Sequence, residues 1–162
     1  MIIRDAAPAD WPRIWPFFHA IVAAGDTFAY PLDLTYEQSR DLWMLEAPKR
    51  TTVAVDDDGV ILGSATMYAN RGGNGDHVAS ASYMVDPELA GRGVGRALVE
   101  DSLTWARAQG FRGMQFNAVA ETNVYAVKLY QKLGLEIIGT VPEAFNHPTT
   151  GYVGLHVMYI KL

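Results

Sequence analysis

Glycine and arginine alternate in the segment from Val85 to Leu98, which has the sequence VDPELAGRGVGRAL. The Asp-Pro pair turns the chain after a β-rich stretch, and the glycines lead into a helical pattern. Because glycine has no Cβ atom, several backbone N–H groups can converge there on one anion at a helix N-terminus. The helix dipole and the charges of Arg92 and Arg96 favour the same anion. This chemistry indicates the binding of a diphosphate.

The spacing of this segment excludes two common phosphate-binding motifs. A nucleoside-triphosphate loop needs the pattern GxxxxGK[ST], which the chain lacks. A dinucleotide fingerprint needs GxGxxG, but Arg96 occupies the place of its third glycine, and several predicted strands precede the segment. A turn that begins a helix without binding any ligand is the alternative interpretation.

A second motif runs from Asn123 to Leu135 and has the sequence NVYAVKLYQKLGL. Its apolar residues recur at helical spacing, which predicts a packed helix face. Asn123 and Tyr130 are about two helical turns apart, so their side chains project in similar directions. The Asn123 amide can hydrogen-bond an amide-bearing ligand, and a phenol with a pKa near ~10 can protonate a departing thiolate. A tyrosine packed in the core is the alternative interpretation of Tyr130.

The elements that must position these motifs alternate between strand and helix patterns. The predicted strands are residues 2–5, 51–55, 60–68, 77–85, 113–119, 135–141 and 152–160, and the predicted helices are residues 10–24, 35–47, 93–109 and 122–133. This order predicts a single domain over residues 1–162, of the α/β (α+β) class, with a mixed sheet. We expect the first two helices and the loop at residues 26–31 to wall the substrate pocket.

The composition restricts the function further. A net charge of −5 argues against nucleic acid or an anionic membrane as a partner. Basic residues outnumber acidic ones between residues 90 and 134, which indicates a small anionic ligand or, alternatively, solvated helix faces. The chain has no cysteine and its four histidines are scattered, so we expect no metal. No secretory signal or membrane-spanning pattern is evident, and we expect a cytoplasmic protein.

Together, the two motifs resemble the signature motifs of the GNAT superfamily of N-acetyltransferases, in the same order and spacing over residues 77–140. The resemblance implies a largely antiparallel mixed sheet flanked by helices, with splayed central strands at 77–85 and 113–119. It implies acetyl-CoA as the cosubstrate and Tyr130 as the general acid. Ala90 departs from the family, which commonly has Gln or Arg there. The implied coenzyme-binding residues are Met84, Val85, Gly91, Arg92, Gly93, Val94, Gly95, Arg96, Ala97, Asn123 and Tyr130.

Four short segments resemble the subgroup that contains fungal N-acetyltransferases acting on azetidine-2-carboxylate and proline. They are residues 77–81 (HVASA), 115–117 (QFN), 121–123 (ETN) and 147–152 (HPTTGY). The resemblance implies that Asn117 helps to hold a substrate carboxylate and that Ser80 stands near the amine, so both join Tyr130 as catalytic-site residues. That subgroup typically has Asn at the position of Ser80, which argues against a proline-like substrate.

The predicted function is acetyl transfer from acetyl-CoA to the amine of a small molecule, amino-acid-like or toxic. Without a cysteine nucleophile or a Ser-His-Asp grouping, direct attack of a neutral amine on the thioester is favoured, with the Val85 N–H as oxyanion donor. A non-catalytic acyl-CoA sensor of the same fold is the alternative, and the resemblance adds a homodimer as an expectation. The base stays open among Asp76, His77, Glu121, Glu143 and a water held by Ser80 and Asn117.

Overall fold

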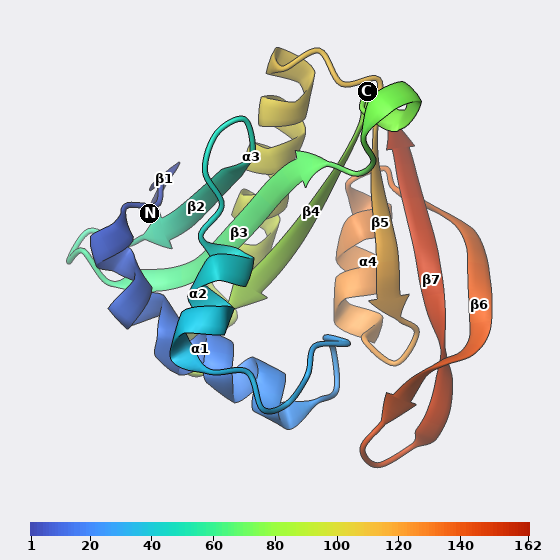
Figure 1. The fold of residues 1–162 in the computed structure, drawn as a ribbon, viewed down its shortest axis with the longest axis horizontal. Helices are drawn as coiled ribbons and strands as arrows, with labels where there is room; N and C mark the ends of the chain where they lie inside the picture. Colours follow the sequence, from blue (N-terminus) through green and yellow to red (C-terminus); the bar gives the residue numbers. More distant parts are fainter.

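A seven-stranded β-sheet runs through the molecule in the computed structural model, which describes residues 1–162 (Figure 1). The strands are β1 (Ile2–Asp5), β2 (Arg50–Val55), β3 (Ile61–Ala69), β4 (Val78–Val85), β5 (Gly113–Ala120), β6 (Glu136–His147) and β7 (Gly151–Lys161). They lie in the order β1-β2-β3-β4-β5-β7-β6. All neighbours are antiparallel except β4 and β5, which run parallel. The predicted mixed, largely antiparallel sheet is therefore confirmed.

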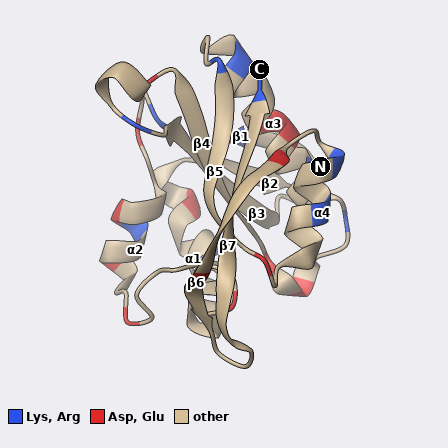
Figure 2. Ribbon diagram, turned by 90° about the vertical axis from the view of Figure 1, so that its right-hand side faces the viewer, with Lys and Arg blue, Asp and Glu red and all other residues tan.

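Helices cover both faces of this sheet. They are α1 (Trp11–Ala24), α2 (Tyr36–Trp43), α3 (Val94–Ala108) and α4 (Val124–Lys132). The first two lie on one face and the last two on the other (Figure 2). One buried apolar cluster gathers aromatic residues of α1 against β2 and β3, and the other packs α3 against β3, β4 and β5. None of these helices combines the length and apolar composition that crossing a membrane requires.

Two elements have bounds that differ from the prediction by more than two residues. The second helix ends at Trp43, because the Leu45 N–H turns back to Thr51 Oγ1 (2.8 Å) and to the Trp43 carbonyl (3.0 Å). The strand predicted to end at Val141 continues as β6 through Pro142. Since β6 is an edge strand with register shifts, a residue without an N–H group is tolerated there.

The sheet opens between β4 and β5. These strands pair only at Val78–Gly113 and Ala79–Met114, near their amino ends. Beyond these pairs they diverge, and α3 and α4 both begin beyond the carboxyl ends of the strands (Figure 1). The predicted splay of the central strands is confirmed, and it leaves one edge of β4 without a strand partner.

Candidate active site

The glycine-rich turn lies between the end of β4 and the start of α3. Gly91 (φ 86°) and Gly93 (φ 76°) adopt the left-handed backbone conformation that other residues rarely take. The Ala97 N–H bonds to the Gly93 carbonyl (3.0 Å), whereas the backbone N–H groups of residues 91–96 have no acceptor within the chain. A row of unpaired N–H groups at a helix N-terminus fits an anion such as a diphosphate.

The two arginines of this turn are held differently. The Arg92 side chain is 56% exposed, and its guanidinium lies 3.8 Å from the Asp56 carboxylate, which makes a loose ion pair. Arg96 pairs at 2.8 Å with Glu100, one helical turn further on. Arg92 can therefore swing toward an anion on the turn, whereas Arg96 would first have to leave Glu100.

Met84 and Val85, at the end of β4, are both predicted to bind the coenzyme. Only Val85 directs a group toward the opening between β4 and β5. The Asp86 N–H donates to the Leu62 carbonyl of β3 (3.0 Å), and N–H directions alternate along a strand. The Val85 N–H therefore points away from β3, into the space between β4 and β5. The Met84 side chain is buried against α1, away from that space.

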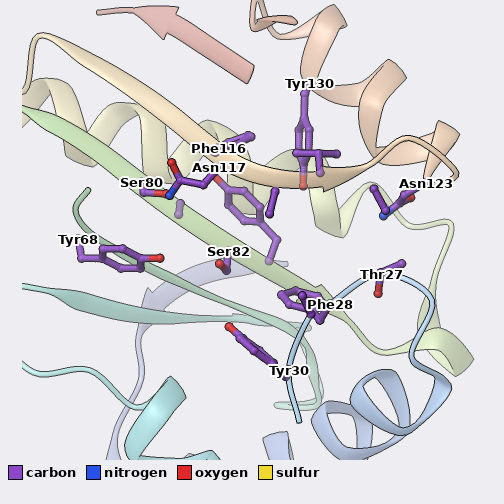
Figure 3. Close-up of a pocket in the computed structure, with 16 residues that line it drawn as sticks. Thr27, Phe28, Tyr30, Tyr68, Ser80, Ser82, Phe116, Asn117, Asn123 and Tyr130 are labelled. Atoms are coloured by element: carbon purple, nitrogen blue, oxygen red, sulfur yellow. The ribbon is translucent and has the colours of Figure 1, made fainter. Parts of the chain in front are cut away.

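A pocket of about 240 Å³ occupies the opening between the two strands (Figure 3). Its walls are residues 27–30 after α1, Tyr68 of β3, residues 80–83 of β4, residues 116–120 of β5, and Asn123 and Tyr130 at α4. The predicted loop thus forms one wall, but α1 and α2 themselves contribute no lining residue. No Asp, Glu, His, Lys or Arg lines the pocket, so its polar side chains are hydroxyls and amides.

Tyr130 reaches this pocket from α4. Its ring packs edge-on against Phe116 with a centroid distance of 4.7 Å, which fixes the direction of the hydroxyl (Figure 3). Burial raises the pKa of Tyr130 above its usual range, so the phenol keeps its proton at ordinary pH and can donate it. Asn123 caps α4 by accepting the Ala126 N–H (3.3 Å), while its side chain also borders the pocket.

Ser80 and Asn117 face the same pocket from opposite strands (Figure 3). Asn117 is exposed and lies where the register between β5 and β7 shifts, and its side chain borders the pocket. Its Nδ2 donates to Asn70 Oδ1 (2.6 Å) and its Oδ1 accepts from Gln115 Nε2 (2.9 Å). The amide is therefore held in one orientation, while the Ser80 hydroxyl, on a residue only 3% exposed, borders the cavity.

Several pocket residues are not predicted from the sequence, among them Ser82 and Tyr68. Ser82 follows Ser80 at a spacing of two, so strand alternation alone could have placed both hydroxyls on one face. Tyr68, at the end of β3, had no comparable signal because it meets the pocket only through pairing of β3 with β4. Burial and the nearby Tyr68 phenol raise the pKa of Tyr30 to about 12, and the Ser82 hydroxyl acts in the opposite direction.

None of the four side chains predicted as candidate bases lines the pocket. Asp76 and His77 precede β4, at the end where β4 and β5 pair. Glu121 accepts the Gly154 N–H at 2.6 Å, and Glu143 lies in an irregular part of β6. No group of three or more His, Asp or Glu lies close enough together to hold a metal ion.

Splayed central strands, an anion-binding turn at α3 and a phenol in the pocket between them define a class of protein, the acyltransferases that use a coenzyme thioester. The sequence profile of the Acetyltransferase (GNAT) family matches residues 14–135. The chain therefore belongs to this family, as the motifs predicted. It is an acyl-CoA-dependent N-acetyltransferase.

Individual relatives agree with this assignment. N-acetyltransferase aca1 of Schizosaccharomyces pombe is 23% identical over 79% of this chain and 68% of its own, which supports the predicted resemblance to fungal enzymes. The L-methionine sulfoximine/L-methionine sulfone acetyltransferase of Pseudomonas paraeruginosa is 32% identical over 87% of this chain and 83% of its own. A solved GCN5-related N-acetyltransferase from Kribbella flavida is 62% identical, with a TM-score of 0.97 over 99% of this chain and 97% of that one.

Proposed function

We propose that residues 1–162 form one domain that moves an acetyl group from acetyl-CoA to the amine of a small molecule, amino-acid-like or toxic, by direct attack. The observation that carries this proposal is a pair of groups with different tasks, one beyond the carboxyl end of β4 and the other in the pocket between β4 and β5. Unpaired N–H groups at the start of α3 suit a diphosphate, and the Tyr130 hydroxyl suits a leaving thiolate. A coenzyme A thioester has both parts.

In this proposal, different residues bind the diphosphate, stabilise the developing negative charge, protonate the sulfur and position the amine. Residues 91–96 hold the diphosphate through backbone N–H groups, whereas the predicted Ala97 N–H is already bonded to the Gly93 carbonyl. The Val85 N–H donates to the thioester carbonyl oxygen, where negative charge develops during attack. Tyr130 keeps its proton until the sulfur leaves and then donates it. Ser80 and Asn117 hold the amine facing the carbonyl carbon, so that the reactants meet in one orientation.

The nature of the partners follows from the pocket and the surface. A cavity of about 240 Å³ suits a small molecule, and one relative is named for two methionine derivatives. The enzyme is proposed to be cytoplasmic, and its net charge of −5 supports the absence of a nucleic-acid or anionic-membrane partner. The edge strand β6 exposes Ile138 (62%) and Val141 (52%), which supports a homodimer through this strand.

The test is thiol release from acetyl-CoA in the presence of a panel of amino acids and small amines, with the acetylated product identified by mass spectrometry. We expect release that depends on the amine. The alternative, a sensor that binds the coenzyme without turnover, predicts a rise in melting temperature with acetyl-CoA but no thiol from any amine. The Tyr130 hydroxyl in the pocket favours turnover, because a sensor has no use for a proton donor there.

A further inference from the structure

The acceptor pocket contains no group that can take a proton from an alkylammonium ion. Its polar side chains are hydroxyls and amides, among them those of Ser80, Ser82 and Asn117. Its phenols are no bases near neutral pH, since burial raises the pKa of Tyr30 to about 12 and moves that of Tyr130 upward as well. An amine that enters this pocket therefore meets only neutral partners.

The charged residues nearest the two open strands are engaged elsewhere. Arg71, which follows β3, donates to the Asn70 carbonyl (3.0 Å). Glu121, which follows β5, accepts the Gly154 N–H (2.6 Å). Neither side chain lines the cavity.

The charged residues on the other surrounding elements do not line the pocket either. Asp101 of α3 is bound to Arg50 (2.8 Å). His156 of β7 shares a hydrogen bond with Thr140 of β6 (2.7 Å). Asp26, before the loop that forms one wall, and Lys128 and Lys132 of α4 are exposed to solvent. No charged side chain of these elements therefore lines the pocket.

The proton balance of acetyl transfer suits such a pocket when the amine arrives neutral. The nitrogen lone pair attacks the thioester carbonyl carbon, a C–N bond forms, and the C–S bond breaks with its electron pair going to sulfur. A neutral primary amine loses one proton and the thiolate gains one, so Tyr130 can protonate the sulfur and recover a proton from the nitrogen. An ammonium ion carries one proton more, which no side chain of the pocket accepts.

Building on the proposed function, we infer that the acceptor is a weakly basic primary amine of the α-amino amide type, which enters the pocket as the free base. At pH 7.5 about a quarter of an amine with a pKa of ~8 is neutral, against about 0.1% of an alkylamine with a pKa of ~10.4. The carboxamide of such a molecule both donates and accepts hydrogen bonds. It therefore matches the hydroxyls of Ser80 and Ser82 and the amide of Asn117.

The first test compares leucinamide with 3-methylbutylamine, the same skeleton without the carboxamide, by measuring kcat/KM between pH 6 and 10.5. For each amine we expect log kcat/KM to rise with a slope of one up to the pKa of that amine. At pH 7.5 leucinamide should then be the better acceptor by about 100-fold. An inflection at one common pH for both amines would reveal a base on the enzyme and overturn the inference, while the acetyltransferase function would stand. Coenzyme binding without thiol release from any amine would instead remove the proposed function itself.

The second test adds the missing base. Ser80→Glu places a carboxylate in the pocket, and Ser80→Gln is the matched uncharged control. We expect the glutamate variant to accept 3-methylbutylamine at pH 7.5 at least about tenfold better than the glutamine variant, with its inflection below the pKa of the amine. Equal rates in two folded variants would contradict the inference, and the wild-type pH profiles decide independently if either variant fails to fold.

Discussion

The two halves of the active site are built in different ways. The turn proposed to bind the diphosphate is one continuous segment, residues 91–96, and its unpaired N–H groups belong to the backbone. The acceptor pocket draws on five separate segments, and its polar groups belong to side chains. Most side-chain substitutions leave the backbone N–H groups in place, as long as the glycines keep their conformation. The pocket can therefore change its preferred amine through single side chains while the turn stays intact.

The halves also differ in their electrostatics. The turn lies near the surface and has two arginines beside it, so its contribution from charge is screened by salt. The pocket has no charged lining residue, and burial raises the pKa values of Tyr30, Tyr83 and Tyr130. One half thus attracts a charge, and the other favours neutral species and a proton donor that stays protonated.

Removing the proton donor should have the largest effect. In the Tyr130→Phe variant we expect kcat to fall roughly ten- to a thousand-fold, because the thiolate then leaves without a proton. The KM for acetyl-CoA should change little, since the turn is untouched. Because the pKa of Tyr130 is raised, its deprotonation should produce no fall in wild-type kcat up to about pH 10. Steady-state kinetics with saturating amine measures all three.

Tyr83 is the matched control for this variant. It also borders the pocket, but its hydroxyl is bound to Ser102 Oγ (2.6 Å) and is not free to donate elsewhere. Tyr83→Phe should leave kcat within about threefold and lower the free energy of unfolding by about 1 kcal/mol through the lost hydrogen bond. Equal losses of kcat in both variants would mean that either phenol merely shapes the pocket.

A left-handed glycine of the turn should give the next largest effect. An added methyl at Gly93 would meet open space, but its φ of 76° costs other residues about 1–2 kcal/mol. We expect Gly93→Ala to raise the KM for acetyl-CoA about tenfold, because relief of that strain turns the N–H groups away. Gly110→Ala is the control, since Gly110 (φ 81°) follows α3 at its other end in equally open space. Both variants should have a lower melting temperature than the wild type. An equal rise in the KM for acetyl-CoA in the two variants would contradict the assignment of the turn as the diphosphate site.

Local patterns explain why the turn and the order of the elements could be predicted. Glycine spacing fixes a backbone conformation within a few residues, and hydrophobic periodicity distinguishes helices from strands. The end of α2 was missed because it depends on the contact between Leu45 and Thr51 across a loop. The length of β6 was missed because only its position at the sheet edge tolerates Pro142.

The pocket was predicted only in part, for a related reason. Ser80, Asn117 and Tyr130 border it, and the roles that the family resemblance implies for them stay predictions. Met84 shares a strand face with Ser80, yet α1 covers its end of β4, and no local pattern reveals that covering helix. Tyr68 comes to the cavity through strand pairing alone. Local sequence patterns therefore do not reveal contacts between residues that are far apart in the sequence and meet only in the folded chain.

The smallest effect should come from the exposed arginine of the turn. Arg92→Gln should raise the KM for acetyl-CoA about two- to fivefold at low salt and less at 0.5 M salt, because an exposed charge is screened. Arg96→Gln is the control; it loses the pair with Glu100, worth about 0.3–0.5 kcal/mol, and should barely change KM. Kinetics at two salt concentrations separates the variants. A hundredfold loss in Arg92→Gln would mean that a side-chain charge, and not the row of N–H groups, holds the diphosphate, and the contrast between a backbone-built turn and a side-chain-built pocket would then fail.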